Sequence, residues 1–162
     1  MRRSTVLGRA VAITGVVLAL CGCATMKKVV GAGPPSVKLT AGDKVNVKAD
    51  GTSLGALHVR VYLLKDATGF RTLSYDDLWS QRKLDKDAAV LDMQEDVLTP
   101  GAEKKLSLNP KKGEDAKSIA VLAGYAQPDG DAGWRQVLDI AGGKNGVEIQ
   151  LGPSGMSPAK VK

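Results

Sequence analysis

The sequence predicts a mainly β protein, a two-sheet β-sandwich with one short added helix. Polar and apolar residues alternate, or apolar residues run unbroken for a few positions, in about seven short segments. Many of the nineteen glycines lie between these segments, which favours a chain with many turns over a helical bundle. The core must rest on valine, leucine, isoleucine and alanine, because the chain holds only two tryptophans, three tyrosines and one phenylalanine.

The first two predicted strands are residues 37–47 and 57–64. In the first, the apolar residues fall on odd positions, which is typical of a half-buried strand, with a bend at Gly42. The second strand has one fully apolar face, and from Tyr62 onward its other face is apolar too. Another element must therefore cover that second face.

A helix at residues 75–84 is the predicted cover. Ser74 precedes it as a hydroxyl N-cap, and Asp77, three residues later, makes a pattern close to a capping box. Tyr75 and Trp79 belong to one face at helical spacing. We expect this aromatic face to pack on the sheet rather than to bind a ligand.

The rest of the chain alternates short strands with turns. Residues 119–125 are apolar on both faces, which predicts a central strand. The last two strands are predicted as a pair joined by the glycine-rich residues 142–146, with a disordered tail at 153–162. The predicted strands after the helix are residues 90–93, 97–98, 106–108, 119–125, 134–140 and 147–151.

The N-terminus has the basic start, short apolar run and small-residue exit of a secretory signal. The run at residues 10–20 is about half of the roughly 20 apolar residues that a membrane-spanning helix needs. At its exit, Leu20 stands three residues before Cys23 and Gly22 directly before it, which resembles the lipobox of bacterial lipoproteins. This resemblance implies a signal peptide over residues 1–22 and lipid on Cys23. A plain signal that contains two cysteines is the alternative.

Acylation of Cys23 would give stable membrane anchoring, because each buried CH₂ of an acyl chain contributes about 0.8 kcal/mol. Residues 23–36 then form a lipid-anchored linker, and the β-sandwich domain spans residues 37–152. The linker is rich in small residues and ends near two prolines. Fully extended at about 3.3 Å per residue, it reaches roughly 40 Å from the bilayer.

Composition and motifs argue against nucleic-acid binding, catalysis, metals and cofactors. Of 23 basic residues three lie in the signal, so the mature chain carries 20 − 17 = +3, too little charge to indicate nucleic acid. His58 is the only histidine, and no Gly-x-Ser-x-Gly elbow is present. The glycines at 142–146 lack the spacing of a phosphate-binding loop.

Six segments between residues 37 and 151, in one order behind the lipobox, carry a further resemblance. They are Val45-Asn46, Val59-Arg60-Val61-Tyr62-Leu63-Leu64-Lys65, Phe70, Leu98-Thr99-Pro100-Gly101, Val121 to Tyr125 and Trp134-Arg135. In this pattern the chain resembles the outer-membrane lipoprotein of the type VI secretion system, the TssJ family. The resemblance implies a transthyretin-like β-sandwich on the periplasmic face of the outer membrane, in multiple copies within a membrane complex.

The same resemblance implies a partner and a contact. The partner is the periplasmic C-terminal region of a large inner-membrane secretion protein, and the contact is the loop between the first two strands. In this chain the loop is Val47, Lys48, Ala49, Asp50, Gly51, Thr52, Ser53, Leu54, Gly55 and Ala56. Val47 stands where the family often has proline, and Thr52 where a basic residue is common. Ala24 is not the aspartate that favours inner-membrane retention.

Two other classes of function remain open on the sequence. A periplasmic lipoprotein that binds a small ligand or a cell-wall component would need a closed apolar pocket near Tyr75 and Trp79. A lipoprotein enzyme would need His58 or a pair of carboxylates for turnover.

Overall fold

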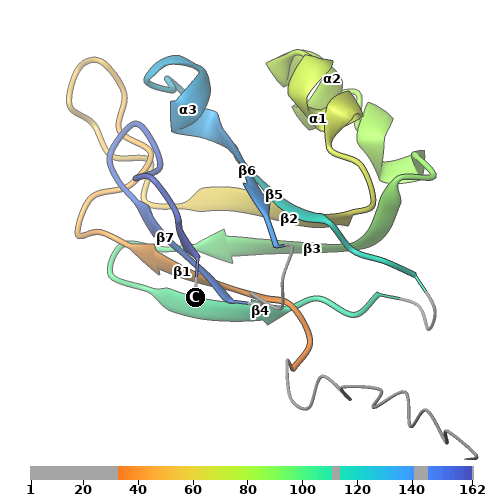
Figure 1. The fold of residues 1–162 in the computed structure, drawn as a ribbon. Coiled ribbons are helices and arrows are strands. Elements are labelled where there is room, and N and C mark those ends of the chain that lie inside the picture. Colours follow the sequence, from red (N-terminus) through yellow and green to blue (C-terminus); the bar gives the residue numbers. More distant parts are fainter. Residues whose placement is uncertain (1–32, 111–113, 141–145, 162) are drawn as a thin grey trace, which may run out of the picture.

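The computed structural model describes residues 33–110, 114–140 and 146–161 (Figure 1). In these residues eight strands form two four-stranded sheets that pack face to face. The elements are β1 (Ser36–Ala41), β2 (Leu57–Leu64), α1 (Thr68–Thr72), α2 (Tyr75–Trp79), η1 (Lys83–Lys86), β3 (Val90–Leu98), β4 (Glu103–Ser107), β5 (Ser118–Ala123), α3 (Gly130–Trp134), β6 (Arg135–Asp139), β7 (Gly146–Leu151) and β8 (Lys160–Val161). The predicted two-sheet β-sandwich is confirmed.

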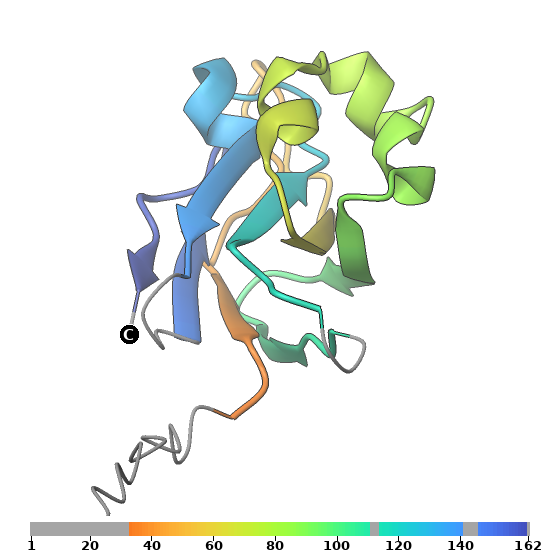
Figure 2. The same cartoon turned by 45° about the vertical axis from the view of Figure 1, so that its right-hand side comes forward.

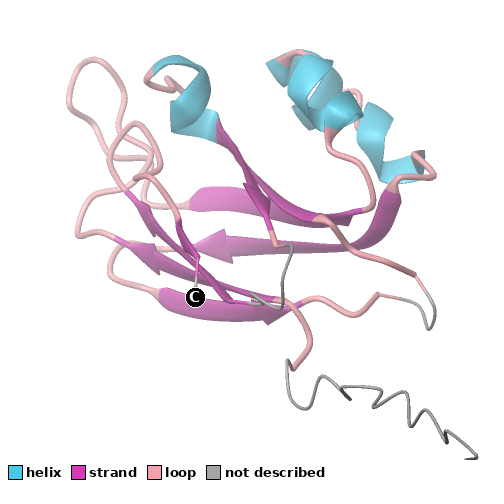
Figure 3. Cartoon of the chain, in the orientation of Figure 1, coloured by secondary structure: helices cyan, strands magenta, loops and turns pink. Residues whose placement is uncertain are grey.

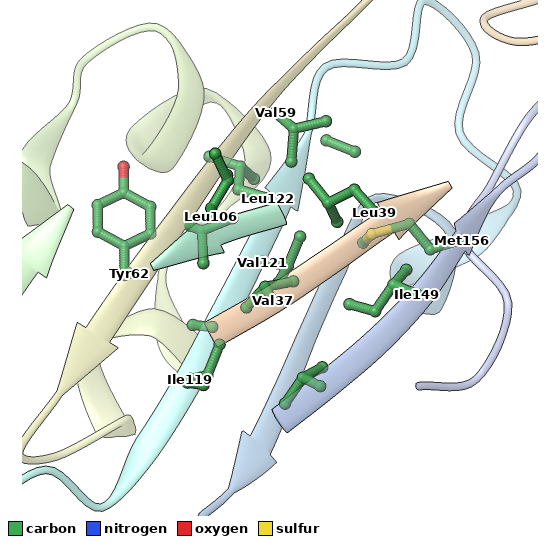
Figure 4. Packing of buried hydrophobic residues seen from close by; sticks show 14 of the residues in the cluster. Val37, Leu39, Val59, Tyr62, Leu106, Ile119, Val121, Leu122, Ile149 and Met156 are labelled. Carbon is green, nitrogen blue, oxygen red and sulfur yellow. The ribbon is translucent and has the colours of Figure 1, made fainter. Parts of the chain in front are cut away.

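The first sheet has the order β4-β1-β7-β8, and the second has the order β3-β2-β5-β6. Only the pair β1 and β7 is parallel; the other five pairs in the described residues are antiparallel. Every second side chain of β1 is buried, as the odd-position pattern predicted. Figure 4 shows Val37 and Leu39 of β1 beside Ile149 of β7 and opposite Val121 of β5 in the common core.

α1, α2 and η1 lie on one side of the strands, over the outer face of the second sheet, and α3 lies at the end of β6 (Figures 2 and 3). Phe70 of α1 meets the ring of Tyr62 edge-on, with 6.0 Å between the ring centroids. The Tyr62 hydroxyl donates to Asp85 at 2.8 Å, and burial together with this bond raises the pKa of Tyr62. The second face of β2 is therefore covered, at Tyr62 by Phe70 of α1 and Asp85 of η1, which lie outside the predicted helix. β5 is buried along its whole length, as expected of a central strand.

The predicted helix at residues 75–84 is shorter than expected. Its capping box is present, because Ser74 accepts from the N–H of Asp77 and Asp77 accepts from that of Ser74. The bonds from Lys83 and Ser74 lower the pKa of Asp77 to about 2. The helix ends at Trp79, and Arg82 adopts the left-handed region with φ 51° before η1. This turn places Arg82 against Asp85 and Glu95, contacts that helical spacing alone does not reveal.

The predicted pairing of the last two long strands is wrong, because they lie in opposite sheets. β6 pairs with β5, whereas β7 lies parallel to β1, where its buried residues extend the core. Residues 90–93 and 97–98 belong to one strand, β3, whose polar middle lies at the edge of the second sheet. The first predicted strand ends earlier than expected, at Ala41.

The predicted disordered tail is also corrected for the residues that the structure describes. Met156 pairs with Leu151 and is only 8% exposed, because it closes one end of the apolar core. β8 then pairs with the start of β7. The tail lacks a long apolar pattern, so its burial follows from the sheets that it meets. The predicted signal peptide, residues 1–22, and Cys23 lie outside the described residues.

Candidate partner-binding loop

The loop after β1 lies at the end of the domain away from the point where the chain enters. β1 starts at Ser36, and its six residues, at about 3.3 Å each, carry the chain roughly 20 Å before the loop begins. Figure 1 shows the orange-yellow loop at the upper left and the start of β1 at the lower right. β1 therefore runs from the N-terminal side of the domain to the side on which the loop lies.

Asn46 clamps the base of the loop. Its backbone is left-handed, with φ 52°, and its side chain is buried with 7% exposure. The side-chain nitrogen donates to the carbonyl of Ala56 at 2.9 Å, and the side-chain oxygen accepts from the N–H of Ala126 at 2.8 Å. One amide thus joins both ends of the loop to the segment after β5. The resemblance included Asn46, but its sequence position gave no sign of this role.

Hydrogen bonds within the loop give it a defined shape. Val47 and Ser53 form an antiparallel bridge, and the N–H of Lys48 donates to the carbonyl of Thr52 at 2.9 Å. Asp50 accepts from the N–H of Thr52 at 2.8 Å, and this bond lowers the pKa of Asp50, so its carboxylate is charged at neutral pH. Gly51, with φ 83°, supplies the left-handed turn that a side chain would strain.

The surface of the loop combines one apolar side chain with polar ones. Residues 48–55 are all exposed. Leu54 is 44% exposed, and among the described residues only Val97 is another exposed large apolar residue. Lys48 and Asp50 add one charge of each sign. Preorganised loops that present an apolar anchor within a polar rim are suited to protein contacts.

The C-terminal segment is hydrogen-bonded to the start of the loop. The N–H of Val47 donates to the carbonyl of Pro153 at 2.7 Å, and that of Asp129 donates to Ser154 at 2.8 Å. Gly133 and Gly155 let the two backbones meet, since a Cβ on Gly155 would lie 3.0 Å from the Cα of Gly133. Residues 47–56 thus lie together in one loop, whose first residue is bonded to the C-terminal segment.

The aromatic face of α2 packs on the second sheet, as predicted. The guanidinium of Arg60 lies over the Trp79 ring at 4.4 Å and donates to the carbonyls of Leu78 and Trp79 at 3.2 and 2.9 Å. Tyr75 stacks against Trp79 at 6.2 Å. Two hollows that the structure contains, of about 1000 and 270 Å³, lie beside β6 and are lined by neither aromatic residue.

Arg60 and Arg135 belong to the segments that carry the resemblance, but the sequence pattern did not reveal their structural role. Arg60 is only 5% exposed, and it bonds to Glu95 as well as to the end of α2. Arg135 makes the same kind of link to α1, since it donates to the carbonyls of Phe70 and Leu73 at 3.3 and 2.8 Å. Each arginine binds the last carbonyls of a short helix to the sheet.

The described residues hold no cluster of metal ligands and no membrane-spanning helix. His58 is exposed on β2, and no group of three or more histidines, cysteines or acids in this part of the chain is arranged to hold a metal ion. No helix there is long and apolar enough to cross a membrane.

Comparison with known families decides what the chain is related to. The family model of the type VI secretion lipoproteins (VasD, EvfM, TssJ) matches residues 34–154, most of the chain. This chain belongs to the type VI secretion lipoprotein family. No curated protein sequence matches it.

Solved structures show the fold of the type VI secretion lipoproteins in this chain. The TssJ1 lipoprotein of Pseudomonas aeruginosa is 27% identical with a TM-score of 0.65, and the alignment covers 80% of this chain and 98% of that one. Lip of Serratia marcescens, a membrane-bound component of the secretion system, is 28% identical with a TM-score of 0.63, covering 77% and 96%. A chain in the structure named "T6SS protein TssM C-terminal domain (869-1107) from EAEC" is 24% identical with a TM-score of 0.63, covering 76% and 98%, and shares the fold.

Proposed function

We propose that this lipoprotein is anchored through Cys23 to the periplasmic face of the outer membrane and docks a large inner-membrane secretion protein of the TssM type. The loop at residues 47–56 binds the periplasmic C-terminal region of that partner. One observation carries the proposal: an ordered, exposed loop with one exposed apolar side chain, that of Leu54, lies at the end of β1 opposite the entry of the linker.

The position of the loop supports docking across the periplasm. A linker of thirteen residues between Cys23 and Val37 reaches roughly 40 Å when extended, at about 3.3 Å per residue. β1 then carries the chain along its own length before the loop begins. The loop therefore faces away from the lipid and toward a partner that rises from the inner membrane.

The chemistry of the loop supports a protein as its ligand. Because the bridge between Val47 and Ser53 and the Asn46 clamp fix its shape, binding orders few residues of this chain. Leu54 supplies an apolar contact, and Lys48 and Asp50 supply charge selectivity. A chain of the same fold is found in the structure named "Type VI membrane complex", with a TM-score of 0.65.

Leu54→Ser is expected to weaken binding of the partner's periplasmic C-terminal region by about tenfold, because an exposed apolar anchor loses about 1.4 kcal/mol of contact. Titration calorimetry with the purified partner region measures the change. Val97→Ser is the matched control, since Val97 is equally exposed, at 45%, but lies on β3. Unchanged affinity for Leu54→Ser, or equal losses for both variants, would remove the loop from the interface.

Cys23→Ser is expected to move the protein from the membrane fraction to the soluble periplasm, because the acceptor of the lipid is gone. Cell fractionation and immunoblotting show the distribution. Cys21→Ser is the control and keeps the protein in the membrane, since residue 21 leaves with the signal. A Cys23→Ser protein that still sediments with the outer membrane contradicts the anchor.

A further inference from the structure

β6 has an open edge in the second sheet. It is the last strand in the order β3-β2-β5-β6, and the N–H of Ile140 donates to the carbonyl of Lys117 at 3.0 Å. Because bonding residues alternate in an antiparallel pair, Gln136 and Leu138 also bond toward β5. Val137 and Asp139 therefore turn their N–H and C=O groups outward, where they bond to no described residue.

The other strand edges of the described residues are blocked in ways that natural sheets use against unwanted pairing. On β3, Asp92 accepts from the N–H of Met93 at 2.9 Å and Asp96 accepts from that of Val97 at 2.8 Å, so side chains occupy the edge donors. β4 begins with three exposed charged residues, and β8 has only two residues. β6 alone keeps an unblocked apolar residue at its centre.

The charge pattern of β6 is complementary to that of a second β6 placed antiparallel to it. Arg135 begins the strand, Val137 is its middle residue, and Asp139 ends it. All three side chains lie on the outer face, since Gln136 between them reaches the inner side and donates to the carbonyl of Ser157 at 2.7 Å. Asp139 is 74% exposed; its carboxylate accepts from the Ser118 hydroxyl at 3.0 Å and lies 4.0 Å from Arg71.

We propose that β6 pairs with β6 of a second copy of this chain, antiparallel about a two-fold axis at Val137. In this register Val137 meets Val137 of the second copy, and the two exchange both outward bonds. Arg135 of each copy lies opposite Asp139 of the other copy. The symmetry therefore gives two such pairs, and no like charges face each other. The two second sheets then form one sheet of eight strands.

The edge of β6 borders two hollows, and the C-terminal segment lies on its inner side, where Gln136 bonds to Ser157 and Ala159. Val137 borders both hollows, the larger one with Gln136 and Leu138 and the smaller one with Arg71 and Arg135. Arg135 is fixed by its bonds to α1 and to Asp131, so its charge is held beside the edge before pairing. The pairing does not depend on which protein the loop binds.

Disulfide trapping tests the register. The parent is the full chain with Cys21→Ser and Cys23→Ser, which has no cysteine left. Val137→Cys places two sulfur-bearing residues about 5.5 Å apart at Cα in the proposed pair, inside the range for a disulfide. The control is Val97→Cys, an exposed residue on the blocked β3 edge. We expect Val137→Cys to form covalent dimers at least tenfold faster.

A second variant tests the charge complementarity. Asp139→Arg, added to Val137→Cys, places like charges opposite Arg135 of the other copy and is expected to slow trapping at least fivefold. Far-UV circular dichroism confirms that each variant is folded. Equal trapping rates for Val137→Cys and Val97→Cys overturn the pairing, and a fast rate that Asp139→Arg leaves unchanged overturns the register.

Discussion

Arg60→Met is expected to lower the free energy of unfolding by about 3 kcal/mol, because it leaves several polar groups without their partner. Methionine keeps the length of the side chain and its contact with Trp79, but it cannot donate to the carbonyls of Leu78 and Trp79. It also leaves Glu95 with one cation fewer. The end of α2 therefore loses its link to β2.

Urea unfolding of the cysteine-free parent, followed by tryptophan fluorescence, measures this effect. Arg71→Met is the matched control, since Arg71 is 55% exposed with one contact at 4.0 Å, and its loss is expected to stay below about 0.5 kcal/mol. Arg60→Lys should fall between them, because an ammonium cannot stack on the indole and bond to both carbonyls in the same way. Equal stability of the Arg60 and Arg71 variants would show that α2 is held by packing alone.

Gly124→Ala is expected to destabilise the domain by about 2–3 kcal/mol through overpacking. A Cβ at this position would lie 2.3 and 2.6 Å from two atoms of the Trp79 ring. The ring cannot move away cheaply, because Arg60 lies over it and Tyr75 stacks against it. The absence of a side chain at residue 124 is thus what lets α2 approach β5.

Gly69→Ala is the control for this substitution, because its Cβ would meet neighbours at 3.6 and 3.7 Å, ordinary contact distances, inside α1. It is expected to be neutral or slightly stabilising, since alanine favours a helix over glycine. Thermal unfolding compares the two variants. If Trp79→Phe, with a smaller ring, recovers part of the loss in Gly124→Ala, the two positions are coupled as the structure indicates. Additive losses would contradict the contact.

The sequence predicted correctly those elements that depend on a pattern of neighbouring residues. The alternation in β1, the two-sided apolar run of β5 and the capping pair of Ser74 and Asp77 are each properties of a few neighbouring residues. The position of the loop followed from the two strands beside it, whereas the partner proposed for it came from the resemblance. α1 and α3 are as short as α2, at five residues each, but they lack a capping pair, since neither N-cap makes a side-chain hydrogen bond.

Contacts between distant residues account for what the sequence did not predict. Arg60 has its structural role because it donates to the last carbonyl of α2, and Asn46 has its role because it accepts from the N–H of Ala126. Both partners are distant in the sequence, so neither contact is visible in the residues nearby. The separation of β6 and β7 into different sheets depends on the strands that each one meets, β5 and β1. The tail is ordered because Met156 fills space that the sheets leave open.

The place of β1 also determines how the domain carries mechanical load. A pull between Ser36 and the loop acts along β1, which is bonded to β4 on one side and to β7 on the other. The hydrogen bonds to β4 stand across this direction, so they are sheared together instead of opening one at a time. Forced unfolding depends on the rate of crossing the unfolding barrier, and shared shear raises that barrier. A force applied between Ser36 and the loop is thus carried by β1, a strand that is hydrogen-bonded to a neighbouring strand on each side.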